Sequence, residues 1–180
     1  MKIYEEIKKY LFFWINFYKK PVVIYQTILD TRSSEHPFSS SDSRDQTFLK
    51  AFLVLVVFFA AIAGLLDSLY TVFVVTITTA FALFFHSILV YILLRLAWVR
   101  QRFNISICLY ISGLSVALRL PTVLIPNFWH IPAVIGIALF ALGAFWGATY
   151  LIKLSTQASL SFALVLSLIN LLFYIFSSLI

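Results

Sequence analysis

The chain has 180 residues, of which 62% are hydrophobic and 11% are charged. A soluble domain is typically about half apolar and roughly a quarter charged, so this composition excludes a water-soluble globular fold and indicates an integral membrane protein. The net charge of +6 would suggest nucleic acid in a soluble protein. In a membrane protein this charge is better explained by an orientation signal and by contact with anionic lipid headgroups. We therefore expect no nucleic-acid partner.

Residues 1–30 are predicted to form cytoplasmic amphipathic helices that lie at the membrane interface. Apolar residues three or four positions apart share one helical face: Ile3, Ile7, Tyr10, Leu11, Trp14 and Tyr18. Four lysines, Lys8, Lys9, Lys19 and Lys20, are expected to contact anionic headgroups. Pro21 should break this helix or begin a second one.

The rest of the chain divides into a polar linker and a membrane domain. Residues 31–47 are rich in Ser and Asp and are predicted to be a linker. In the region 48–180, five apolar runs follow at about 49–66, 70–94, 104–125, 132–152 and 157–180. A helix needs roughly 20 residues to cross a hydrocarbon core of about 30 Å. The predicted fold class is therefore an all-α integral membrane protein, a five-transmembrane-helix bundle with an N-terminal interfacial helix.

Basic residues alternate between the two ends of these runs. They gather before the first run, between the second and third at Arg95, Arg100 and Arg102, and between the fourth and fifth at Lys153. The other two turns and the end of the fifth run hold none. The positive-inside rule then predicts a cytoplasmic N-terminus and a C-terminus outside. Because the N-terminal region is short and carries no sorting signal, we expect a bacterial inner membrane.

One arginine, Arg119, lies inside the third run, two residues before Pro121. Its side chain could reach the outer interface, or it could face a cavity or partner inside the bundle, where intramembrane charges usually point. Asp67 and His130 fall in the two outer turns, so Asp67, Arg119 and His130 form a candidate outer polar cluster. Pro121 should kink the helix or mark its end.

Two further polar residues lie within apolar runs, His86 in the second and Asn170 in the fifth. Residues of this kind commonly hold neighbouring helices together by hydrogen bonds, and a proton relay is the alternative role.

The fourth run carries a face of small residues. Gly143 and Gly147 are one turn apart, and Ala144 and Ala148 repeat that spacing. Such a face lets another backbone approach closely, either within the chain or in an oligomer.

The sequence holds no phosphate-binding glycine loop, no metalloprotease or hydrolase motif and no Cys/His metal spacing. Six of the seven acids precede the first run, which removes two-carboxylate chemistry from the membrane. We therefore expect no catalytic residues, no metal and no cofactor, and a protein that is not an enzyme.

A resemblance comes from WGATYLIKLSTQASLSFALVL, residues 146–166. In this stretch Trp146 leads a span, Lys153 and Ser155 belong to a short basic and polar turn, and Ala158 begins the final span. Residues 110–121 add a weaker likeness. With the five closely spaced runs, this layout resembles the Yip (Ypt-interacting protein) family over about residues 10–180, as a bacterial-type member. In eukaryotes that family is associated with Rab-type GTPases and membrane trafficking. For bacterial members the resemblance implies a membrane scaffold.

The function hypothesis is a non-enzymatic membrane scaffold or adaptor. It would bind membrane lipids, and it would either bind another membrane protein or associate with itself. It could act as an accessory subunit of a larger membrane complex. The alternative is a channel or transporter subunit with a polar path near His86, Asp67 and Arg119. An enzyme acting on lipid-linked substrates is the weakest of the three, since only His130 and Asp67 could serve as its base.

Overall fold

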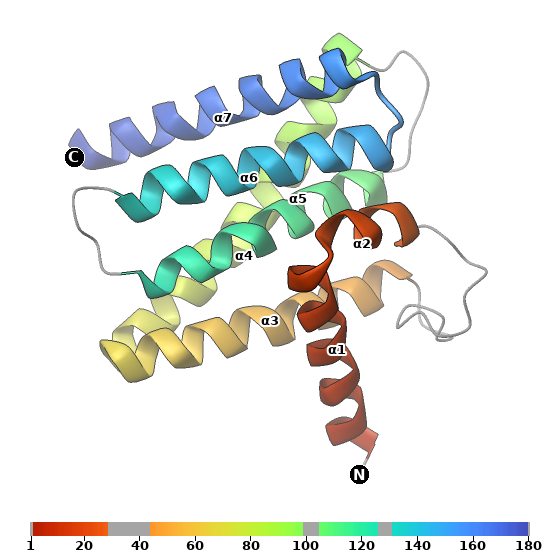
Figure 1. Ribbon diagram of the computed structural model, residues 1–180. Coiled ribbons are helices and arrows are strands. Elements are labelled where there is room, and N and C mark those ends of the chain that lie inside the picture. Colours follow the sequence, from red (N-terminus) through yellow and green to blue (C-terminus); the bar gives the residue numbers. More distant parts are fainter. Residues whose placement is uncertain (1, 29–43, 99–104, 126–130, 180) are drawn as a thin grey trace. The chain divides into compact units, whose positions relative to one another are not determined.

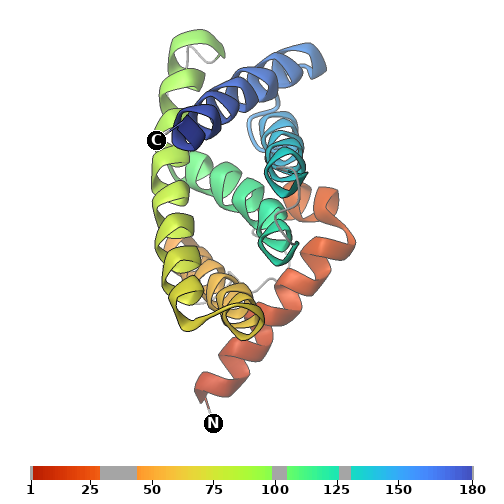
Figure 2. The same ribbon diagram turned by 90° about the vertical axis from the view of Figure 1, so that its left-hand side faces the viewer.

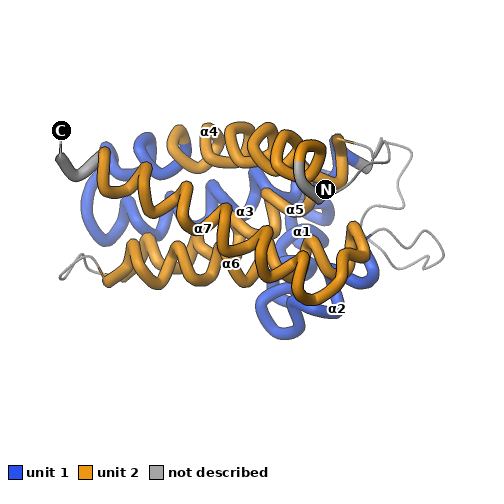
Figure 3. Tube along the Cα trace, turned by 90° about the horizontal axis from the view of Figure 1, so that it is seen from above, with its two compact units in different colours: residues 1–76 blue, residues 77–180 orange. Residues whose placement is uncertain are grey.

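The computed structural model describes residues 2–28, 44–98, 105–125 and 131–179, and every element in these ranges is helical. Figure 1 shows the α-helices and two short π- and 3-10 segments: α1 (Lys2–Lys19), α2 (Pro21–Thr27), α3 (Arg44–Leu66), α4 (Leu69–Leu93), η1 (Leu94–Trp98), α5 (Ile105–Arg119), η2 (Leu120–Leu124), α6 (Ile131–Tyr150) and α7 (Thr156–Leu179). The chain forms two compact units, residues 1–76 and 77–180, and the division falls within α4 (Figure 3).

Five helical segments are long and apolar enough to cross a membrane, which confirms the predicted all-α fold with five spans. They cover Asp45–Leu66, Leu69–Leu96, Ile105–Leu124, Ile131–Tyr150 and Thr156–Phe176. The chain is therefore a multi-pass integral membrane protein. Most of the predicted polar linker lies outside the described residues, but residues 44–47 already belong to α3. The carboxylate of Asp45 falls in the first turn of α3, where the helix dipole favours a negative charge.

In unit 1, α1 packs against α3 through aromatic side chains. Trp14 is 1% exposed, and its indole Nε1 donates a hydrogen bond of 2.6 Å to the carbonyl oxygen of Ala51. The rings of Phe13 and Phe17 meet Trp14 edge-on at centroid distances of 4.9 and 5.4 Å. A buried indole N–H needs an acceptor, and the small Ala51 leaves its backbone carbonyl within reach.

The residues of α1 that are buried in the protein coincide only in part with the apolar face that spacing indicated. Tyr10 and Trp14 of that face are buried together with Phe13 and Phe17, whereas Ile3 is exposed. The reason is that α3 selects the aromatic face for packing, while the periodicity of α1 alone contains no information about its neighbour. The contact of the apolar face with the membrane interface stays a prediction. The lysines predicted to contact headgroups are all exposed: Lys8, Lys9, Lys19 and Lys20.

In unit 2, α6 packs against both α5 and α7 (Figure 2). A Cβ at Gly143 would lie 2.7 Å from the Cα of Ser115, and one at Gly147 would lie 2.8 Å from Cγ1 of Ile111. As the residue numbers of the glycines rise along α6, the residue numbers of their contacts on α5 fall, so the two helices run antiparallel. Residues 110–118 of α5 are all buried, so this stretch is covered on every face and not only where α6 approaches it.

Near Pro121, α5 gives way to the 3-10 helix η2 at Leu120. Proline cannot donate the backbone hydrogen bond that would continue the α-helix. The hydroxyl of Thr122 instead donates to the carbonyl oxygen of Arg119 at 2.8 Å. The α-helix therefore ends at Arg119, which is the second of the two outcomes expected for Pro121.

The turn between α6 and α7 is built by Lys153 and Ser155. Lys153 adopts a φ of 62°, in the left-handed region that favours glycine. The Oγ of Ser155 accepts a hydrogen bond of 3.3 Å from the backbone N–H of Ala158 and so caps α7. Three of the residues that carry the family resemblance, Lys153, Ser155 and Ala158, thus form this turn and the start of the last span.

Candidate ligand-binding cavity

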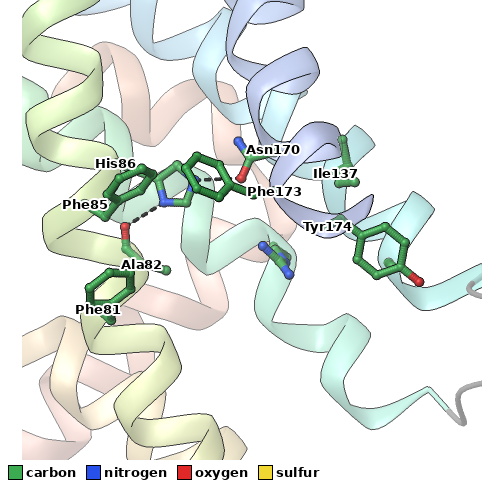
Figure 4. A pocket seen from close by; sticks show the side chains of 10 residues that line it. Phe81, Ala82, Phe85, His86, Ile137, Asn170, Phe173 and Tyr174 are labelled. Atoms are coloured by element: carbon green, nitrogen blue, oxygen red, sulfur yellow. Dashed lines mark hydrogen bonds between the residues drawn. The ribbon is translucent and has the colours of Figure 1, made fainter. Parts of the chain in front are cut away.

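A cavity of about 350 Å³ lies among the spans of unit 2. Its lining comes from α4, α5, α6 and α7: Phe81, Ala82, Phe85, His86, Arg119, Ala133, Ile137, Asn170, Phe173 and Tyr174 (Figure 4). Small-ligand pockets typically measure roughly 300–1,000 Å³, with mainly apolar and aromatic walls and a few polar groups that orient the ligand. This cavity has that size and that mixture of side chains.

Two of the polar groups, His86 and Asn170, join α4 to α7. His86 Nδ1 lies 2.6 Å from the carbonyl oxygen of Ala82, and Nε2 lies 2.7 Å from Oδ1 of Asn170. The Nδ2 of Asn170 donates to the carbonyl oxygen of Leu166 at 2.9 Å. Figure 4 shows the two contacts of His86, with Ala82 and with Asn170. His86 and Asn170 therefore act as an interhelical contact, the first of the two roles considered from sequence.

Aromatic rings form the wall beside His86. The rings of Phe85 and Phe173 meet edge-on with centroids 5.2 Å apart, and Phe81 stacks on Phe85 at 5.9 Å. On the α6 side, the ring of Phe140 lies 4.5 Å from that of His86. Phe81 and Phe173 are themselves exposed. In a membrane, exposed apolar side chains face lipid, so this wall borders both the cavity and the acyl chains.

Arg119 supplies the positive charge of the site. A Cβ at Gly136 of α6 would lie 3.1 Å from Cγ and 3.2 Å from Nε of Arg119, so the arginine stem crosses α6 at the position without a side chain. Arg119 also lines a second cavity of about 110 Å³ with Thr78, Thr79, Ala82, Val116, Leu120 and Val123. Arg119 is also exposed, so whether its charge reaches the outer interface or faces the inside of the bundle stays a prediction.

The predicted outer cluster of Asp67, Arg119 and His130 stays a prediction. Asp67 is exposed in unit 1, where its carboxylate accepts a hydrogen bond from the hydroxyl of Thr71. Arg119 belongs to unit 2, and His130 lies outside the described residues.

The small-residue face of α6 is buried within the chain. Gly143, Ala144, Gly147 and Ala148 are all buried, and the two glycines lie against α5. A neighbouring helix of the same chain therefore covers the two glycines. This is the intramolecular role, one of the two that the sequence left open.

Sequence reasoning missed Gly136 and the aromatic wall. Gly136 lies seven residues before Gly143 and therefore on the same face of α6, so its spacing was a usable signal. Phe85 and Phe173 gave no such signal, because phenylalanines are frequent throughout the spans.

The chemistry of the cavity is that of a binding site. Both ring nitrogens of His86 already contact hydrogen-bonding partners, so this imidazole is not a free general base. Within the described ranges, no group of three or more His, Cys, Asp or Glu residues could hold a metal ion. No family model, curated protein or solved structure matches this chain.

Proposed function

We propose that this chain is a non-enzymatic integral membrane protein that binds a membrane amphiphile in the cavity of unit 2. The observation that carries the proposal is the cavity itself, with aromatic walls from α4 and α7 and polar side chains at His86, Arg119 and Asn170. Acyl chains match the aromatic wall, and the polar side chains match a headgroup or linker. Lipid is thus the primary partner within the scaffold and adaptor role expected from sequence.

A second protein is the less favoured partner for the α6 face. Because α5 covers Gly143 and Gly147, a helix from another protein would have to displace α5 to use that face. The close approach that small residues permit is already made within the chain.

Photo-crosslinking with a lipid that carries a diazirine in its acyl chain tests the proposal. We expect the full chain in lipid nanodiscs to be labelled at Phe85 and Ile137. Ala133→Trp should abolish this labelling by filling the cavity, whereas Ala138→Trp on the exposed face of α6 should leave it unchanged. Equal labelling of both variants at Phe85 and Ile137 would refute the proposal.

The orientation and cellular location are also proposals. The alternation of basic residues supports a cytoplasmic N-terminus and an external C-terminus. The resemblance of residues 146–166 supports a bacterial-type protein of the Yip family, located in a bacterial inner membrane. Fusions of alkaline phosphatase and of a fluorescent protein after Ile180 provide the test. Phosphatase activity without fluorescence is expected, and fluorescence without phosphatase activity would reverse the orientation.

A channel or transporter subunit is the second candidate, and one observation favours it. Arg119 and Ala82 line both cavities, so the two spaces adjoin the same side chains. Reconstituted vesicles that show a solute or proton flux, lost on Arg119→Leu, would support this function. Absence of flux from vesicles with verified protein would remove it.

A further inference from the structure

Resting on the proposed binding function, we propose that the cavity selects an amphiphile with an anionic head, a phosphate or a carboxylate, whose charge lies against Arg119. The cavity supplies the apolar wall, and Arg119 supplies a cation fixed at its edge. The proposal concerns the class of ligand, so it can fail while amphiphile binding itself holds.

The first argument is the absence of an internal counter-ion in unit 2. The sequence of residues 77–180 contains no Asp or Glu, and Asp67 is the last acid of the chain. Charged groups within membranes are costly and normally pair with an opposite charge or a polar group. Asp67 is already hydrogen-bonded to Thr71 in unit 1. An anionic ligand therefore supplies the charge that the sequence of unit 2 lacks.

The second argument is the contact between the Arg119 stem and α6. Although Arg119 is exposed, its stem crosses α6 at Gly136, where an added Cβ would lie 3.1 Å from Cγ and 3.2 Å from Nε. A stem packed on a helix leaves the guanidinium fewer orientations, so presenting its N–H donors to a phosphate or carboxylate costs less entropy. Gly136 is thus a positioning residue for Arg119.

The experiment uses the full chain in nanodiscs and three diazirine acyl probes: phosphatidylglycerol, phosphatidylcholine and palmitic acid. We expect both anionic probes to label Phe85 and Ile137 roughly ten- to hundredfold more efficiently than phosphatidylcholine. Arg119→Leu should remove this preference, and Arg119→Lys should retain part of it. A gain restricted to phosphatidylglycerol would assign a phosphate head, and one restricted to palmitic acid a carboxylate.

Matched variants separate this inference from the loss of folding. Gly136→Ala should displace the Arg119 stem and weaken the preference by less than Arg119→Leu does, while Arg95→Leu removes a cation that does not line the cavity and should change nothing. Asp67→Asn should also leave the preference intact.

Each other result overturns the inference. Equal labelling by all three probes shows amphiphile binding without selection of an anion. A preference that survives Arg119→Leu places the selecting charge elsewhere. Failure of every probe to label Phe85 or Ile137 would overturn the proposed function as well.

Discussion

The contact between α5 and α6 and the contact between α4 and α7 belong to the same unit, yet they are built in opposite ways. Between α5 and α6, glycines bring the helices so close that an added Cβ would lie 2.7 Å from the Cα of Ser115. Between α4 and α7, long side chains meet instead, through the hydrogen bond of His86 with Asn170 and the edge-on rings of Phe85 and Phe173.

This difference separates the role of each contact. Close backbone approach gives dense van der Waals contact and leaves no room for a ligand, which is how helices associate when lipid offers no hydrophobic drive. Contacts made at the ends of large side chains hold helices farther apart, and the space beside them is the cavity of about 350 Å³. The α5–α6 contact therefore stabilises unit 2, and the α4–α7 contact shapes a binding site.

The largest effect is expected from breaking the close contact with Gly143→Leu. The new side chain would collide with the backbone of Ser115, which cannot move aside as a side chain can. Overpacking typically costs about 1–3 kcal/mol, and we expect about 3 kcal/mol or more here. Thermal unfolding and size-exclusion chromatography in detergent provide the measurement. Ala138→Leu, on the exposed face of the same helix, is the control; equal unfolding temperatures for the two variants would contradict the close-packing account.

A smaller effect is expected at the open contact. A double-mutant cycle with His86→Ala and Asn170→Ala should give a coupling of about 1 kcal/mol, since interhelical hydrogen bonds in membranes contribute about 0.6–2 kcal/mol. The measurement is the free energy of unfolding in mixed micelles. Additive effects of the two substitutions would mean that this hydrogen bond does not couple α4 to α7.

The smallest effect is expected in the turn that joins α6, a member of the close contact, to α7, a member of the open one. Lys153 has a φ of 62°, which glycine adopts without the steric cost that a side chain imposes. Lys153→Gly should raise the free energy of unfolding by up to about 1 kcal/mol, the usual scale of left-handed strain. A loss of stability of that size would show that the lysine side chain makes a compensating contact.

The sequence was sufficient to predict the five spans, because each apolar run matches the thickness of a bilayer on its own. It also singled out His86, Asn170 and Arg119, because polar residues stand out in apolar runs. It could not pair His86 with Asn170, since that pairing depends on the rotation of two helices and joins residues 84 positions apart. Nor could it identify Phe13 and Phe17 as buried, because a neighbouring helix buries them and the periodicity of α1 does not.

The central claim is that an amphiphile enters the cavity while the α5–α6 contact stays closed to it. Nuclear Overhauser effects between methyl groups of the protein and one equivalent of undeuterated phosphatidylglycerol, measured in deuterated detergent, test this directly. We predict transfer from acyl protons to the methyls of Ala82, Ala133 and Ile137, which line the cavity, and none to the methyls of Ile111, whose side chain lies against Gly147 in the α5–α6 contact. Absence of transfer to the three cavity methyls, or equal transfer to both groups, would contradict the account.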